Sequence, residues 1–232
     1  MNFFRVEKDV DGFHPVDMGN LAIQGREPLF VPCAPKGCIE LFLQYGVELI
    51  GKKAVVIGRS KIVGLPVSLL LQISRHSMVH AMTKNPEQVT SEAHIVITDI
   101  GVPNIVRGFW LKPEATVIDK GTNSVKVDGE FGVLERTWSV DDWTWVDGFC
   151  ITISKFSVSP ISQCVFWWDL VLWSEWDANS LHGHRVVGDV CYEEAITKAS
   201  AITPVPGGVG PVTIAMLLSN SLDSAKRAYN IA

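Results

Sequence analysis

Three short apolar segments recur along the chain, with polar or helical stretches between them. They are Ala54–Ile57, Ile95–Ile100 and Thr116–Asp119, and each is rich in β-branched residues and almost unbroken. This texture is typical of strands that are buried on both faces of a parallel sheet. Met78–Met82 is a weaker fourth strand candidate.

Helical patterns lie before, between and after these strands. Lys36–Tyr45 precedes the first strand, Pro66–Ser74 follows it with a proline in its first turn, and Pro211–Tyr229 ends the chain. Proline is tolerated in the first turn of a helix, where its missing N–H costs no hydrogen bond. The alternation predicts an α/β fold, a Rossmann-like doubly wound parallel sheet.

The stretch from Val133 to Gly183 does not fit this pattern. It contains seven of the eight tryptophans, and its seven acidic and two basic residues equal the net charge of the whole chain, −5. It shows neither a sustained helical period nor the alternation of a hairpin, and a structureless stretch of this length is unusual inside a compact domain. We interpret residues 133–183 as an insertion, either translated intron or a lineage-specific loop whose tryptophans form a partner surface.

Composition narrows the class of protein. The 232 residues are 47% hydrophobic and 19% charged, as expected of a globular chain, and no run of Lys and Arg suggests nucleic-acid binding. The longest apolar run, Val165–Trp173, is interrupted by Asp169 and is too short to span a membrane. Five cysteines without a C-x-x-C pair and six histidines without ligand spacing favour free thiols and no metal site.

A glycine-bounded turn follows the first strand directly. Gly58-Arg59-Ser60-Lys61-Ile62-Val63-Gly64 leads into the helix at Pro66. A strand, a glycine turn and a helix N-terminus together form a dinucleotide site, because unpaired N–H groups and the helix dipole attract the pyrophosphate. The spacing is not G-x-G-x-x-G, so an ordinary tight turn would look the same.

The residues around this turn favour NADP over NAD. An NAD site usually has an acidic residue at the end of the second strand, to bind the ribose 2′-hydroxyl. Here that strand ends in Met82-Thr83-Lys84-Asn85, without a carboxylate. Arg59 can form charge-assisted hydrogen bonds to a 2′-phosphate. Thr83 and Lys84 are weaker candidates, since a solvated loop would also contain them.

Several longer motifs carry a family resemblance. KDVDG at residues 8–12, PCAPKGC at 32–38, GRSKIVGLPVSLLL at 58–71, VVGDVCYEEA at 186–195 and PVPGGVGP at 204–211 occur in order. The chain resembles the bifunctional methylenetetrahydrofolate dehydrogenase/methenyltetrahydrofolate cyclohydrolase (FolD-like) family, most of all its plant members. The resemblance implies NADP-dependent oxidation of 5,10-methylene- to 5,10-methenyltetrahydrofolate, hydrolysis to 10-formyltetrahydrofolate, two lobes with folate between them, and a homodimer.

The resemblance also implies roles for individual residues. Asp11 would contact the pterin, whose paired donors suit a carboxylate, and the PVPGGVGP loop would line the folate cleft through Pro206, Gly207 and Gly208. The cofactor would be bound by Gly58, Arg59, Ser60, Ile62, Thr83, Gly101 and Gly210.

Other family features are missing or altered. In the family, a lysine in a Tyr-x-x-x-Lys motif carries out the hydrolysis, assisted by a glutamine in a Q-L-P segment. In this sequence no tyrosine is followed by lysine four residues later and no Q-L-P occurs, so neither catalytic residue is present in these residues. Residues 1–31 are therefore expected to be a remnant of the folate-binding lobe, and residues 32–232 the NADP domain. A non-catalytic NADP-binding fragment or pseudoenzyme is the alternative. The cytoplasm is the expected compartment, with plastid and mitochondrion as alternatives.

Two substitutions fall in the cofactor domain itself. Asp99 stands where the family usually has a small residue near the nicotinamide, and Lys120 replaces an apolar residue on a buried strand. Because an unpaired buried charge is costly, the two side chains are expected to pair with each other.

Overall fold

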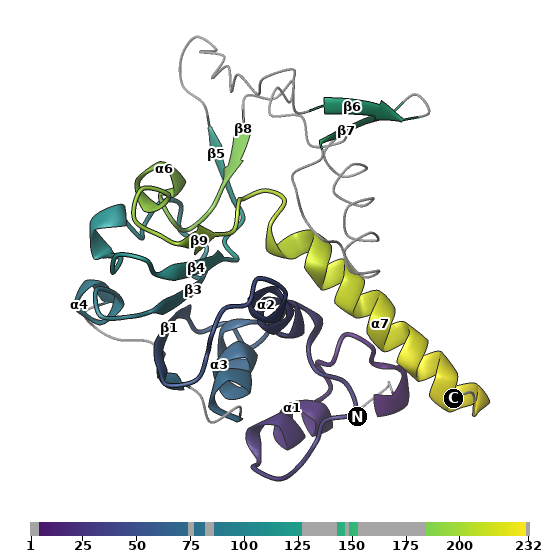
Figure 1. Cartoon of the computed structure of the whole chain (residues 1–232). Coiled ribbons are helices and arrows are strands. Elements are labelled where there is room, and N and C mark those ends of the chain that lie inside the picture. Colours follow the sequence, from purple (N-terminus) through teal and green to yellow (C-terminus); the bar gives the residue numbers. More distant parts are fainter. Residues whose placement is uncertain are drawn as a thin grey trace.

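A parallel sheet forms the centre of the molecule (Figure 1). The structure is a computed structural model, and it describes residues 5–73, 77–81, 86–126, 143–146, 149–152 and 184–230. Five strands pair in the order β2-β1-β3-β4-β9, every pair parallel. Their bounds are β1 Lys52–Gly58, β2 Ser77–Ala81, β3 Ile95–Asp99, β4 Thr116–Asp119 and β9 Ala201–Ile202. All four strands expected from the sequence are present, and the α/β fold class is confirmed.

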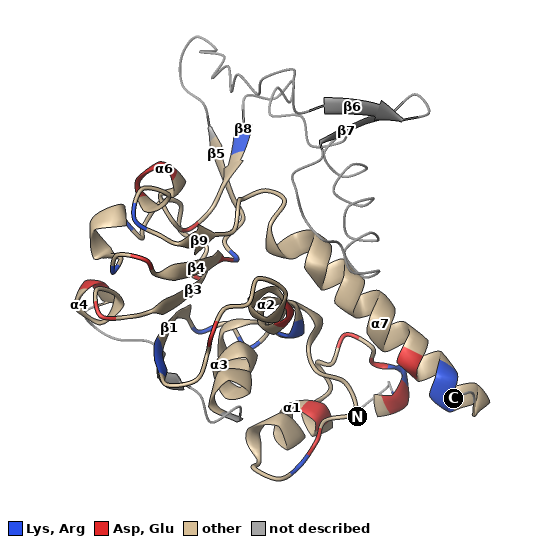
Figure 2. Ribbon diagram, viewed as in Figure 1, with Lys and Arg blue, Asp and Glu red and all other residues tan. Residues whose placement is uncertain are grey.

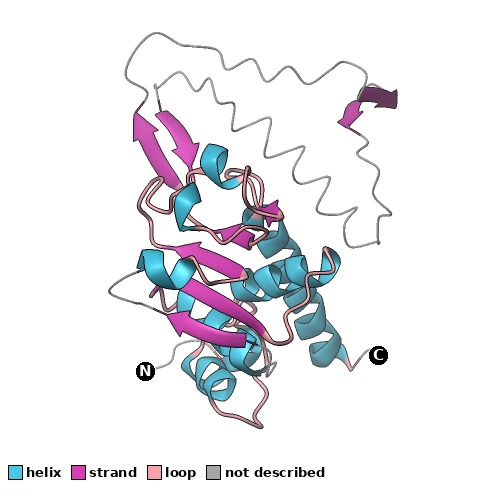
Figure 3. Ribbon diagram, turned by 60° about the vertical axis from the view of Figure 1, so that its left-hand side comes forward, coloured by secondary structure: helices cyan, strands magenta, loops and turns pink. Residues whose placement is uncertain are grey.

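Helices and loops cover both faces of the sheet (Figure 3). The helices are α1 Pro15–Ala22, α2 Cys33–Gln44, α3 Gly64–Ile73, α4 Pro86–Thr90, α6 Tyr192–Ala195 and α7 Val209–Tyr229, with short 3-10 turns η1 Val6–Lys8 and η2 Gly108–Trp110. The three helices expected from the sequence are confirmed. Helices α2, α3 and α7 begin two or three residues earlier than expected, because the prolines near their starts lie within the first turn, where proline is tolerated.

The strands are apolar throughout because successive side chains alternate between two cores. Ala54 and Val56 of β1 point into one core, which also holds residues of α2, α3 and the start of α7. Val55 points into the other, with Val96 and Val117 of the neighbouring strands and residues near η2 and α6. Both faces of every central strand are therefore buried, which explains the unbroken apolar segments of the sequence.

The N-terminal residues are attached to α2 and α7. Asn220, a buried residue of α7, donates hydrogen bonds from its side-chain amide to the Val10 and Val31 carbonyl oxygens at 2.9 and 3.1 Å. Its Oδ1 accepts a hydrogen bond from Lys36 Nζ at 2.9 Å. One side chain thus joins three segments that are far apart in the sequence.

Two pairs of strands lie outside the main sheet. β5 Asn123–Lys126 pairs with β8 His184–Val187 in antiparallel register, with Lys126 opposite His184. The 57 residues between the two strands therefore begin and end side by side, as the residues of an insertion would. That residues 133–183 are an insertion stays a prediction.

One expectation about that stretch is wrong. β6 Trp143–Val146 and β7 Phe149–Thr152 form an antiparallel pair, although the sequence pattern did not indicate a hairpin. The two residues between them are Asp147-Gly148, a dipeptide that favours two-residue hairpin connections. This signal was present in the sequence and was overlooked.

In the part of the chain that the structure describes, no helix is both long enough and apolar enough to cross a membrane.

Candidate functional site

The candidate site lies at the carboxyl ends of β1 and β3. The chain runs from β1 through α3 to β2 on one side of β1, and then crosses to β3 on the other side. In open α/β sheets ligands bind in the crevice at such a switch in strand order. Gly58 and Asp99, the last residues of β1 and β3, are register partners there. A Cβ atom on Gly58 would overlap the Asp99 carbonyl oxygen, so the close approach of these strand ends requires glycine.

The turn after β1 is closed by its own hydrogen bonds. Ser60 Oγ accepts from the N–H groups of Ile62 and Val63 at 3.1 and 3.2 Å. The Leu65 N–H donates to the Ser60 carbonyl oxygen at 2.9 Å, and the Gly64 N–H donates to Asp99 Oδ2 at 3.0 Å. The sequence predicted unpaired N–H groups at this helix start, and the structure corrects that prediction: four of them are satisfied by oxygens of the chain itself.

Arg59 is one of two exposed cations of this turn, with Lys61. Its side chain makes no ion pair or hydrogen bond within the described residues, so its guanidinium can be offered to an anion from solution. Ile62, at 54% exposure, also lies open at the surface of the turn, and Ser60 is half-buried. The turn thus presents a cation, a hydroxyl and an apolar side chain together. Thr83 lies outside the described residues.

Asp99 does not pair with Lys120. Among the described residues no ion pair joins them, and the Asp99 carboxylate instead binds the Gly64 N–H at the start of α3. Burial raises the pKa of Asp99, and the Gly64 N–H, the Ser60 hydroxyl and the more distant Lys120 charge act in the opposite direction. The expected pair was wrong because a backbone donor lies closer to the carboxylate than the lysine does.

Two buried aspartates organise the strand ends beside this turn, and the sequence analysis missed both. Asp119, at the end of β4, accepts hydrogen bonds from Thr98 Oγ1 and from the N–H groups of Gly121, Asp189 and Val190, at 2.8 to 3.1 Å. Burial raises the pKa of Asp119, and these four donors oppose the shift. The available signal was a carboxylate directly after an apolar strand, which has to find donors when it is buried.

Asp189, fully buried, holds the loop that follows β3. Its carboxylate accepts from the N–H groups of Ile100, Gly101 and Val102 at 2.7 to 3.3 Å, and from Asn123 Nδ2 at 2.9 Å. Gly101 has a φ of +78°, which favours glycine. The Gly101 N–H donates to the Asp189 carboxylate. The cofactor contact expected of Gly101 stays a prediction.

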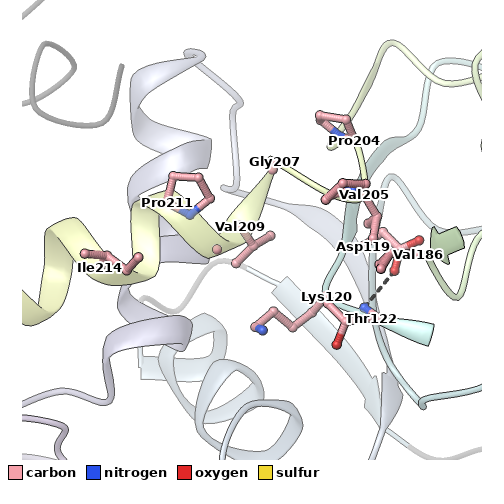
Figure 4. Close-up of a pocket in the computed structure, with 14 residues that line it drawn as sticks. Asp119, Lys120, Thr122, Val186, Pro204, Val205, Gly207, Val209, Pro211 and Ile214 are labelled. Atoms are coloured by element: carbon pink, nitrogen blue, oxygen red, sulfur yellow. Dashed lines mark hydrogen bonds between the residues drawn. The ribbon is translucent and has the colours of Figure 1, made fainter. Parts of the chain in front are cut away.

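A cavity of about 230 Å³ lies between the ends of β4 and β8 and the start of α7 (Figure 4). The PVPGGVGP loop forms much of its wall, and the Lys120 side chain extends beneath Val209. The residues of this loop that were expected to bind substrate, Pro206, Gly207 and Gly208, all line the cavity. Gly210, one of the expected cofactor residues, lines it too. Gly207 has a φ of +101°, which favours glycine. The loop thus forms a pocket wall.

Asp11 is placed apart from this cavity. It is exposed, is not among the cavity's lining residues, and its carbonyl oxygen accepts a hydrogen bond from the Cys33 N–H at 3.3 Å. Acidic and basic residues are scattered along the described ribbon (Figure 2). The sequence-derived site residues that the structure describes therefore fall into four places: the turn after β1, the loop after β3 with Gly101, the cavity at α7, and the start of α2.

Comparison with known proteins gives consistent matches. The model of the tetrahydrofolate dehydrogenase/cyclohydrolase NAD(P)-binding domain matches residues 32–136 and 177–229. The chain is 52% identical over 233 residues to bifunctional protein FolD 1, mitochondrial, and 49% identical over 232 residues to FolD 4, chloroplastic, both from Arabidopsis thaliana. Each alignment covers 99% of this chain and 51% of the relative, so the chain spans about half the length of these relatives.

Solved structures agree with the sequence comparisons. The Trypanosoma brucei methylenetetrahydrofolate dehydrogenase-cyclohydrolase, solved with NADP and an inhibitor, is 34% identical with a TM-score of 0.72. That match covers 97% of this chain and 61% of the other. A Campylobacter jejuni FolD enzyme matches at 32% identity with a TM-score of 0.65, covering 97% and 60%.

Proposed function

The chain belongs to the tetrahydrofolate dehydrogenase/cyclohydrolase family through its NAD(P)-binding domain, and from this premise we propose that it binds NADP at the carboxyl ends of β1 and β3. The observation that carries the proposal is the turn from Gly58 to Gly64 at the switch in strand order, with the exposed Arg59 guanidinium, unpaired among the described residues, beside it. In this proposal Arg59 binds the ribose 2′-phosphate, while Ser60, Ile62, Thr83, Gly101 and Gly210 contribute further contacts.

We further propose that the complete protein acts in one-carbon folate metabolism. Bound NADP would accept a hydride from 5,10-methylenetetrahydrofolate, a reaction in which the protein mainly positions donor and acceptor. The cavity at the start of α7 is the place proposed for the folate, with Pro206, Gly207 and Gly208 in its wall. Asp11 is proposed to reach the pterin from the start of α2, and the homodimer of the family is proposed for this chain too.

Calorimetry with NADP and NAD tests the cofactor proposal. Replacing Arg59 by alanine should weaken NADP binding by about 1.5–3 kcal/mol and leave NAD binding almost unchanged, because only NADP carries the 2′-phosphate. Lys61→Ala is the matched control, since it removes an exposed positive charge from the same turn. Equal losses for both cofactors would show a structural role of Arg59, and no heat with NADP for the unaltered protein would overturn the proposal.

A second candidate is a non-catalytic NADP-binding protein of the same family. It is favoured by one observation: none of the three tyrosines in the 232 residues is followed by lysine four positions later. In the family this lysine manages the proton transfers of the hydrolysis. We therefore expect the 232-residue polypeptide to bind NADP without hydrolysing methenyltetrahydrofolate. Hydrolysis above the uncatalysed rate would contradict this expectation, and oxidation of the methylene form would favour the first candidate.

A further inference from the structure

Asp99 lies where a dinucleotide would enter the site. It ends β3 and lies opposite Gly58, so its carboxylate is at the switch in strand order between β1 and β3. The side chain is half-buried, and its Oδ2 is 3.0 Å from the N–H of Gly64, the first residue of α3. A carboxylate therefore already occupies the positive end of a ten-residue helix.

The neighbouring donors are engaged in the same way. The Ile62 and Val63 N–H groups donate to Ser60 Oγ, and together with the Gly64 N–H they are the groups that a phosphate would use at this helix start. The Ser60 hydroxyl is neutral and can rotate aside at little electrostatic cost. The Asp99 carboxylate has the same sign of charge as a phosphate, so the two anions compete for one position.

We propose that Asp99 is an internal anion that the cofactor has to displace from the start of α3, and that it therefore weakens NADP binding. The proposal rests on the proposed function, since it assumes that NADP enters this turn. The competition ends when the carboxylate turns away from Gly64 or accepts a proton from solution. In the second case NADP binding is accompanied by proton uptake.

The groups that face Asp99 determine how readily it takes up that proton. Lys120, from the end of β4, lowers the pKa of Asp99, and Asp189, which follows β8, raises it. The third titratable group that interacts electrostatically with Asp99 is Cys38 of α2. Burial raises the pKa of the Cys38 thiol to about 12, so the thiol stays protonated and uncharged. A phosphate beside Asp99 adds a second negative charge close to the carboxylate, which raises its pKa further.

Calorimetry of the full chain with NADP tests the proposal. Titrations at neutral pH in two buffers of different ionisation enthalpy measure both the affinity and the number of protons taken up. Asp99→Asn keeps the shape of the side chain and removes its charge, and Asp99→Ala removes the competing oxygen entirely. Glu87→Gln is the matched control, because it removes one negative charge from an exposed position on α4.

We expect both Asp99 variants to bind NADP about 3- to 10-fold more tightly than the unaltered chain, the range of one hydrogen-bonding competitor. Any proton uptake measured for the unaltered chain should be lost in both, and Glu87→Gln should change neither quantity. Equal affinity and equal uptake in all proteins would overturn the proposal, as would the same tightening in Glu87→Gln. Absence of NADP binding in every protein would instead overturn the proposed function, and this inference with it.

Discussion

Three aspartates lie at the carboxyl ends of the strands, and their surroundings differ sharply. Asp119 and Asp189, beside β4 and β8, are buried and each accept hydrogen bonds from four donors. Asp99, beside β3, is half-buried and has fewer donors, the Gly64 N–H and the Ser60 hydroxyl. In our proposal the Asp119 and Asp189 carboxylates join the strand ends permanently, whereas the Asp99 carboxylate remains available for displacement because fewer donors hold it.

Replacing Asp119 by alanine should have the largest effect on stability. The change leaves four buried donors without an acceptor, among them Thr98 Oγ1 and the Val190 N–H. We expect a loss of about 3–5 kcal/mol in the free energy of unfolding, measured by urea denaturation. Asp119→Asn keeps one acceptor oxygen and should lose less. A loss below 1 kcal/mol for the alanine variant would remove the distinction between the two regions.

Asp99→Ala should change stability much less. It removes the contacts with the Gly64 N–H and the Ser60 hydroxyl, and it also relieves the desolvation that raises the pKa of this carboxyl. These two effects oppose each other, so the free energy of unfolding should stay within about 1 kcal/mol of the unaltered protein. The same urea denaturation measures it. A loss as large as that of Asp119→Ala would place Asp99 among the permanent contacts.

The smallest effect is expected at Glu194, an exposed carboxylate outside both regions. The Glu194 carboxylate forms an ion pair with Arg107 and accepts a hydrogen bond from the Gly108 N–H. Together these contacts lower the pKa of Glu194 to about 2. A lowered pKa in the folded state adds stability above the ordinary value of 4.5, and this contribution is lost as the pH falls towards 2. Glu194→Gln should therefore lower Tm slightly near neutral pH. The difference from the unaltered protein should vanish towards pH 2; a difference that persists there would contradict the assignment.

The fold was largely predictable because its signals are local. Ile95–Thr98 are four β-branched residues in a row, and α7 is a regular helical pattern. The site was predictable only in part. Its glycine turn is local, but the bond that closes it joins Gly64 to Asp99, and the Asp119 contacts join residues 70 positions apart. Such contacts depend on how the strand ends meet in the folded chain, which no pattern of neighbouring residues indicates.

The central claim is that the turn after β1 binds NADP while the Asp119 carboxylate holds the strand ends together without contacting the cofactor. Backbone amide NMR of the full chain during an NADP titration tests this claim most directly, since it follows both regions in one experiment. We predict that the amide signals of Arg59, Ile62 and Gly64 shift progressively and saturate, while that of Val190 stays in place. Unchanged signals in the turn at saturating NADP, or a shift confined to Val190, would contradict the claim.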